Sequence, residues 1–243
     1  MSGGAKACVD YAMNQQQVTD AIVLARTNYG EADRIVTFLT PDAGKLRLMA
    51  KGVRRIKSKL AGGIELFSVT NITFIRGRGE IGTLVSARLS THYGRIIQNI
   101  DRTMAGYELI KQLHRATEDE PEPEYYHLLV EGFAALDDAS ISLDLLRLWF
   151  GAQLLRLGGH TPNLQAEPDG TRLSAEQRYE FSFEDSAFMS RPDGGYAADD
   201  IKFLRVVFSG NVPGVLTKIA GVDSLTGHTR QLVTFMQQQY IHG

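Results

Sequence analysis

The segment RIVTFLTPDAGKLRLMA, residues 34–50, contains the pattern from which the architecture of the first part of the chain follows. β-Branched and aromatic residues dominate its first seven positions, and a Pro-Asp-Ala-Gly sequence, typical of a tight reversal, comes next. Its last six positions alternate, so that Leu46 and Leu48 share one face and Lys45 and Arg47 the other. The pattern predicts two strands, and the second can bury one side and hold cations in water on the other.

Similar strand signals continue on both sides of this segment. Runs of strand length occupy residues 18–25, 66–76 and 81–89, and Gly62-Gly63 interrupts the chain before the last two. Five short strands with glycine-rich connections predict a small antiparallel barrel over residues 18–92, because closure removes exposed strand edges. An open sheet is the alternative.

The hydrophobic period changes to that of helices beyond residue 92. Residues 160–196 interrupt the helical pattern as a polar excursion, with a small hairpin expected at 179–183 and 187–189. The fold class expected is therefore α+β with two domains, in which residues 93–243 form an all-α domain with an irregular, cysteine-free insertion. Residues 1–17 read as a flexible extension. The predicted helices are residues 97–116, 125–136, 143–157, 200–208, 213–220 and 225–240.

Composition is that of an ordinary globular protein. The chain has 243 residues, 43% of them hydrophobic, and a net charge of −2. A single cysteine, Cys8, excludes an intrachain disulfide framework and a cysteine-rich metal cluster. Apolar runs shorter than about 20 residues predict no membrane span, so the cytoplasm is the expected location.

The charge is unevenly distributed along the chain. Residues 1–95 hold 14 Lys+Arg and 7 Asp+Glu, whereas residues 96–243 hold 12 and 21. The asymmetry is sharpest in KLRLMAKGVRRIKSK, residues 45–59, where seven of fifteen residues are basic and none is acidic. A solvated surface loop is one interpretation. The absence of a nearby compensating acid favours a site for a polyanion.

No motif for catalysis or for a metal is found. GRGEIG, residues 77–82, matches G-x-G-x-x-G, but the alternating TLVSARL that follows predicts a strand where a dinucleotide fold needs a helix. A glycine-rich hairpin is the better interpretation. The six histidines show no metal-binding spacing, and no P-loop or nucleophile elbow occurs, so we expect neither an enzyme nor a cofactor.

A basic β-module is typical of single-strand nucleic-acid binders, in which cations follow the backbone and exposed aromatic rings stack on bases. The candidate rings are Tyr29, Phe38, Phe67, Phe74 and Tyr93.

The stretch from residue 27 to 67 resembles the start of the RecO family of bacterial recombination mediators. The matching pieces are YGEADR (29–34), Thr40, GKL (44–46), AKGVRR (50–55), KSK (57–59) and ELF (65–67). Beyond residue 91 the resemblance is limited to length, helical character and LLRLGG (154–159) followed by an excursion.

The resemblance implies an oligonucleotide-binding (OB) barrel followed by a helical domain. It also implies binding of single-stranded and duplex DNA, annealing of complementary strands and help in loading a recombinase. The implied partners are RecR and the acidic-apolar tail of single-stranded-DNA-binding protein. Many family members bind zinc through cysteines in the excursion, which here contains none, so zinc is not carried over.

We therefore expect a non-enzymatic DNA repair and homologous recombination protein in the cytoplasm, associated with the nucleoid. An RNA-binding barrel is the alternative, and a nucleotide-using enzyme a remote one. The predicted DNA contacts are Arg34, Lys45, Arg47, Lys51, Arg54, Arg55, Lys57 and Lys59, followed by Arg76 and Arg78.

Overall fold

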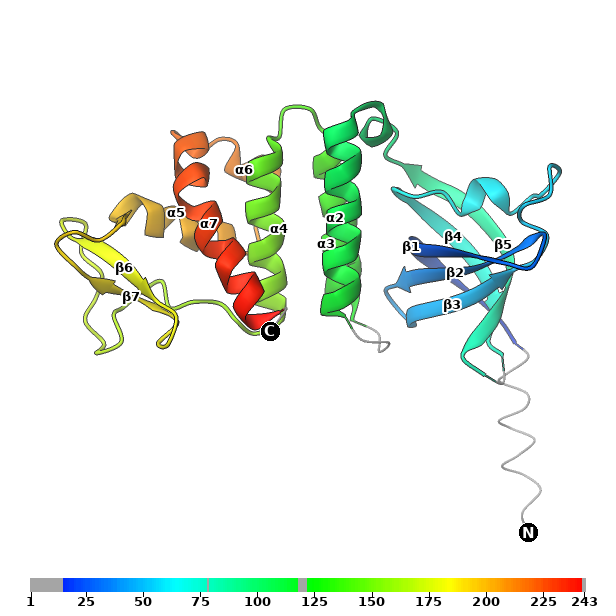
Figure 1. The fold of residues 1–243 in the computed structure, drawn as a ribbon, viewed down its shortest axis with the longest axis horizontal. Helices are drawn as coiled ribbons and strands as arrows, with labels where there is room; N and C mark the ends of the chain where they lie inside the picture. Colours follow the sequence, from blue (N-terminus) through cyan, green and yellow to red (C-terminus); the bar gives the residue numbers. More distant parts are fainter. Residues whose placement is uncertain (1–14, 78, 118–121, 242–243) are drawn as a thin grey trace, which may run out of the picture. The chain divides into compact units, whose positions relative to one another are not determined.

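The computed structural model describes residues 15–77, 79–117 and 122–241, and its chain divides into two compact units, residues 1–137 and 138–243 (Figure 1). Cys8 and most of the predicted extension lie outside the described residues. Gln16 and Gln17, assigned to that extension, are instead the first residues of a strand and pair with Ile75 and Phe74. Among the described helices, none is long and apolar enough to cross a membrane.

The first unit is built on a five-stranded closed barrel with the strand order β1-β2-β3-β5-β4. Five strands followed along the chain by helices confirm the predicted α+β class. The predicted all-antiparallel arrangement is wrong at one seam, since β3 and β5 run parallel. An odd number of strands cannot alternate in direction around a closed ring, so one parallel pair is unavoidable. The strands are β1 (Gln16–Tyr29), β2 (Asp33–Thr40), β3 (Gly44–Ala50), β4 (Ser68–Ile75) and β5 (Ile81–His92).

The barrel interior is filled by the alternating apolar residues of these strands. Val36 and Phe38 of β2 face Leu46 and Leu48 of β3, and all four are buried. Burial of such a side chain contributes about 1.5–3 kcal/mol. The period of two in residues 34–50 therefore sets which face of each strand lies inside.

Two helices pack on the barrel and belong to the same unit. They are α2 (Ile100–Ala116) and α3 (Pro123–Asp137), preceded by a short 3₁₀ helix, Ile96–Gln98. The ring of Phe67 makes edge contacts with Tyr107 of α2, at 5.4 Å between centroids, and with Phe133 of α3, at 5.6 Å. The predicted domain boundary after residue 92 marks the end of the barrel, but the compact unit extends to Asp137 because these helices bury barrel residues.

The second unit consists of helices and a small sheet. Helix α4 ends, as the sequence indicates, at a glycine pair in which Gly159 has a φ of +79°. Helix α6 is shorter than predicted, since the chain turns before the left-handed Gly221. The elements are α4 (Leu143–Leu157), β6 (Arg178–Ser182), β7 (Ala187–Ser190), β8 (Tyr196–Ala197), α5 (Ala198–Phe208), α6 (Pro213–Leu216) and α7 (Val222–Tyr240).

The expectation of an all-α second domain is wrong, because the insertion contains a three-stranded sheet with the order β7-β6-β8. Its hairpin was predicted, and β8 was not. The ring of Phe188 contacts those of Phe181 and Tyr196 edge to face, at 5.1 and 5.4 Å between centroids. Within the part of the chain that the structure describes, no three His, Cys, Asp or Glu side chains gather as a metal site. The residues present do not fit zinc, and aromatic packing stabilises the insertion.

Candidate nucleic-acid interface

The basic segment forms a loop between β3 and β4 that is tied to the β1–β2 turn. The Gly52 amide donates to Asp33 Oδ1 at 2.7 Å, and the Arg54 amide donates to the Ala32 carbonyl at 2.9 Å. The Arg54 guanidinium also donates to the Gly30 carbonyl at 3.4 Å. These hydrogen bonds place the loop and the turn at one end of the barrel.

The exposed part of the loop is held between two apolar anchors. Val53 is buried in the barrel core, and Leu60 packs against that core. Residues 54–57 and Lys59 lie outside it and are exposed. The loop therefore presents its cations to solvent from a fixed base. We call residues 51–59 the basic loop.

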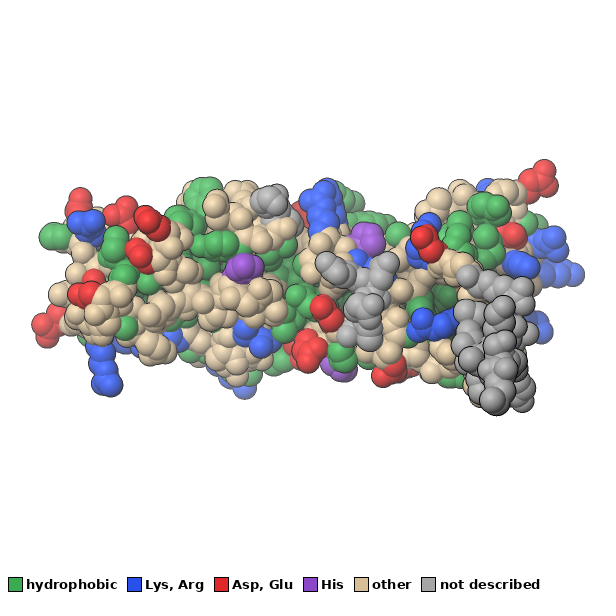
Figure 2. Space-filling model, turned by 90° about the horizontal axis from the view of Figure 1, so that it is seen from below, with side chains coloured by type: hydrophobic (Ala, Val, Ile, Leu, Met, Phe, Trp, Pro, Cys, Tyr) green, Lys and Arg blue, Asp and Glu red, His purple; other side chains and the backbone are tan. Residues whose placement is uncertain are grey.

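The cations of the basic loop have no carboxylate partner. Within the described residues, no carboxylate oxygen lies within 4.0 Å of any of their charged nitrogens. In Figure 2, Lys and Arg side chains (blue) project from the barrel at the right of the view. Five positive charges on nine residues create a local field that attracts a polyanion. They are Lys51, Arg54, Arg55, Lys57 and Lys59.

Lys45 was predicted to contact DNA, but the structure turns its side chain toward helix α2. Its ammonium donates to the carbonyl oxygen of His114 at 2.8 Å and to that of Thr117. These carbonyls lie at the carboxyl end of α2, where a cation is favoured by the helix dipole. Lys45 thus joins the barrel to α2.

Arg34 and Arg47 have partners within the barrel. Arg34 Nε donates to Asn28 Oδ1 at 3.0 Å, and Arg34 pairs across the sheet with Ala50, directly before the basic loop. Arg47 forms an ion pair with Glu80 at 3.2 Å, and both side chains are largely exposed. Exposed pairs of this kind are worth about 0–1 kcal/mol, so a phosphate can compete with Glu80 for Arg47.

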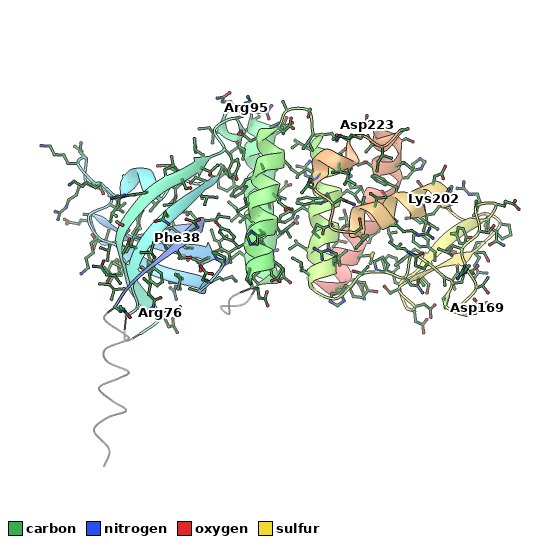
Figure 3. The ribbon with its side chains drawn as sticks, turned by 180° about the vertical axis from the view of Figure 1, so that it is seen from behind. Phe38, Arg76, Arg95, Asp169, Lys202 and Asp223 are labelled. Carbon is green, nitrogen blue, oxygen red and sulfur yellow. The ribbon has the colours of Figure 1, made fainter. Side chains whose placement is uncertain are left out.

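Arg76 lies away from the basic loop. It follows Ile75, which pairs with Gln16 at the start of β1, whereas the basic loop is tied to the turn at the end of β1 (Figure 3). Arg76 Nε donates to Gln17 Oε1 at 3.4 Å. Arg78 lies outside the described residues. The predicted contacts are therefore not all on one side of the barrel.

The glycine-rich segment around Arg78 connects two antiparallel strands, as the sequence predicted. β4 and β5 pair on either side of it, and β5 stands where a dinucleotide fold would begin a helix. A Cβ atom on Gly77 would lie 2.5 Å from the Ile81 carbonyl oxygen, and one on Gly82 would lie 2.6 Å from that of Ile75. The glycines are explained by close backbone packing in the hairpin.

The structure also separates the candidate aromatic rings. Tyr29, the last residue of β1 before the turn that is tied to the basic loop, is 56% exposed. Phe38, Phe67 and Phe74 are buried. Tyr93 is partly buried beside Phe133, and burial together with Asp137 raises its pKa. Tyr29 is the candidate ring placed to stack on a base near the basic loop.

One exposed side chain of the basic loop was not singled out from the sequence. Ile56 is fully exposed, at 105%, between Arg55 and Lys57. The signal that marks it is an apolar residue inside an otherwise polar run, RRIKSK.

Comparison with known proteins finds sequences similar to the part of the chain that holds these features. The family model described as "Recombination protein O N terminal" matches residues 13–93, which include the barrel and the basic loop. Proteins named "DNA repair protein RecO" are similar over a longer range. That of Dehalococcoides mccartyi is 33% identical over 148 residues, which cover 60% of this chain and 58% of that protein.

Two further relatives with this name give a similar result. The protein of Streptomyces griseus is 34% identical over 154 residues, 60% of this chain and 62% of that protein. The protein of Trichodesmium erythraeum is 37% identical over 134 residues, 54% of this chain and 44% of that protein. The matches thus span about half of these relatives' lengths. They confirm the similarity to the RecO family, and residues 13–93 are the part in which the amino-terminal domain of that family is matched.

Proposed function

We propose that this protein mediates DNA repair and homologous recombination without catalysis, and that its barrel is an oligonucleotide-binding fold that holds DNA through the basic loop. The observation that carries the proposal is the set of five exposed cations on a loop tied to the barrel, with no carboxylate partner among the described residues. The names of the relatives support the same role.

The loop cations suit both single-stranded and duplex DNA, because phosphates are common to both. Contacts to phosphates carry no sequence information, so binding should be nearly independent of sequence. Cations held between two strands also lower their mutual repulsion, which is what the annealing of complementary strands requires. We propose annealing and assistance in recombinase loading on this basis and on the family resemblance.

The dependence of affinity on salt tests this use of the loop. If five phosphates of a single strand are neutralised, log affinity should fall with log salt with a slope of about −3.5. Changing Arg54, Arg55, Lys57 and Lys59 together to Glu should abolish binding, because four attractive charges become repulsive.

The matched control changes the same number of exposed cations elsewhere, namely Arg88, Lys111, Arg172 and Lys218 to Glu. Both variants have the same net charge, so only the position of the charges differs. Equal losses of affinity in the two variants would contradict a role specific to the loop. Competition with structured RNA in the same titration distinguishes a DNA-binding from an RNA-binding barrel.

We further propose that RecR and the acidic-apolar tail of single-stranded-DNA-binding protein are partners, and that the protein works in the cytoplasm at the nucleoid. These partners rest on the resemblance. A cavity of about 500 Å³ in the second unit supports a docking role, since Phe203, Val206 and Leu225 line it together with Lys202. Fluorescence anisotropy of a labelled tail peptide measures this binding, and no binding to the full chain would contradict it.

A further inference from the structure

Ile56 occupies a position that neither burial nor local conformation explains. The Ser58 amide donates to the Arg55 carbonyl at 3.0 Å, so Ile56 and Lys57 are the central residues of a tight turn. Such positions favour Gly, Pro, Asn, Asp and Ser, and a β-branched residue there gains nothing from the turn. Ile56 also makes no use of its apolar surface within the described structure, because its side chain is fully exposed.

The loop is built so that Ile56 stays outside. Val53 is buried in the barrel core and Leu60 packs against it, while the residues between them form successive turns. The Arg55 amide donates to the Gly52 carbonyl at 3.1 Å, and the Leu60 amide donates to Ser58 Oγ at 3.2 Å. The apolar side chain is therefore held at the tip of the loop.

The charges around Ile56 indicate what it meets. Arg54, Arg55, Lys57 and Lys59 flank it, and none of them is ion-paired within the described part of the chain. An occupant of this tip must carry closely spaced negative charges and an apolar surface beside them. Single-stranded DNA has both, since its phosphates alternate with the faces of unpaired bases.

We propose that Ile56 inserts between neighbouring bases of single-stranded DNA while the flanking cations hold the phosphates. The proposal rests on the DNA-binding function proposed above and adds a contact to the bases. Isoleucine is among the apolar side chains that proteins insert between base steps. A single strand is the favoured substrate, because insertion there does not have to unstack paired bases or kink a duplex.

The two kinds of contact respond differently to salt. Phosphate contacts release counterions and weaken as salt rises, whereas insertion of an apolar side chain between bases does not. A variant that lacks only the insertion should keep the salt slope and lose affinity only for strands that carry bases.

The experiment compares two oligonucleotides of about 16 nucleotides, one with bases and one with an abasic backbone of the same length. The full chain should bind the strand with bases about tenfold more tightly than the abasic strand. Ile56→Ser should reduce that preference severalfold, to the part that stacking on Tyr29 supplies, and leave the abasic affinity and the salt slope unchanged. Ile56→Leu, which keeps the apolar surface, should retain it.

Ile97→Ser is the matched control, because Ile97 is an isoleucine of the same unit that is 61% exposed in the short 3₁₀ helix Ile96–Gln98. It should bind both strands as the unmodified protein does.

Unchanged preference in Ile56→Ser, or an equal loss on both strands, overturns the insertion while the DNA-binding function stands. Failure of the unmodified protein to bind either strand overturns the proposed function itself. Binding to anionic lipid vesicles that requires Ile56, with no base preference, assigns the tip to a membrane surface and also overturns the insertion.

Discussion

Lys45 and Arg47 lie two residues apart on β3 and point from the same face of the strand, yet their surroundings differ. Lys45 donates to the carboxyl end of α2, whereas Arg47 pairs with the exposed Glu80. Alternation along the strand predicted their common face correctly. It contains no information about a helix that packs there from residues about 70 positions later, so it could not predict the hydrogen bonds of Lys45 to α2.

Lys45→Ala should reduce stability more than DNA affinity. Loss of charge-assisted hydrogen bonds to the α2 carbonyls should lower the free energy of unfolding by about 1–2 kcal/mol. Urea unfolding measures this change, and a DNA titration at fixed salt should show little difference. Arg47→Ala is the comparison, with a smaller change in stability. A large loss of DNA affinity in a stable Lys45→Ala protein would show that Lys45 contacts DNA and would contradict this prediction.

Ionisation of Tyr126, in α3, should lower the free energy of unfolding of the first unit at alkaline pH. Burial, with added contributions from Asp20, Tyr93 and Asp42, raises the pKa of Tyr126 to about 12. The folded state therefore retains the phenol proton longer than the unfolded chain, whose tyrosine has a pKa near 10. Its contribution is complete below about pH 10 and is lost as the pH rises toward 12, by about 2 kcal/mol.

Tyr126→Phe should flatten this part of the pH dependence, because no ionisable group remains at that site. Urea unfolding at several alkaline pH values measures the change. Tyr29→Phe, at an exposed position, should leave the profile as it is. Identical profiles for Tyr126→Phe and the unmodified protein would show that another group controls alkaline unfolding.

At the scale of elements, the contact between the barrel and α2 depends on a close approach at Gly106. Phe67 has a φ of +55°, is buried, and points its ring at this glycine. A Cβ atom on Gly106 would lie 2.5 Å from Phe67 Cε1. The ring is enclosed by Tyr107 and Phe133, so it has little room to move away.

Gly106→Ala should therefore destabilise the first unit by about 1–3 kcal/mol, as overpacking does. Gly227 is the matched control, since it lies exposed inside α7 with no atom within 4 Å of an added Cβ. Gly227→Ala should stabilise by up to about 1 kcal/mol through helix propensity. Thermal unfolding should show a lower melting temperature for Gly106→Ala and a higher one for Gly227→Ala. Stabilisation by Gly106→Ala would show that the α2 interface is looser than its geometry indicates.

At the scale of the whole molecule, the charge does not divide between the compact units as it does along the sequence. Residues 1–137 hold 17 Lys+Arg and 16 Asp+Glu, and residues 138–243 hold 9 and 12. Much of the acidic charge lies in residues 96–137, which contain α2 and α3 of the first unit. The net charge of each unit is therefore small. The attraction of a polyanion depends on where the basic loop lies more than on the net charge of the unit.

Cutting the chain between the units should separate DNA binding from partner binding. Residues 1–137 alone should keep the DNA affinity and the salt slope, because they contain the whole barrel, the basic loop and both packed helices. Residues 138–243 should bind no DNA and should retain binding of the tail peptide. Circular dichroism checks that each fragment is folded before titration. DNA binding by the second fragment alone would contradict this division.

Local sequence patterns predicted most of the strands and helices and the similarity to the RecO family. The period of two in residues 34–50, the helical spacing of residues 143–157 and the uncompensated cations of residues 51–59 each act through near neighbours in the chain, so they are readable without a structure. The tertiary structure decided which cations face solvent, which ring is exposed and where the first unit ends. Those features depend on contacts between distant residues, such as Lys45 with His114 and Phe67 with Phe133, and periodicity carries no information about such pairs.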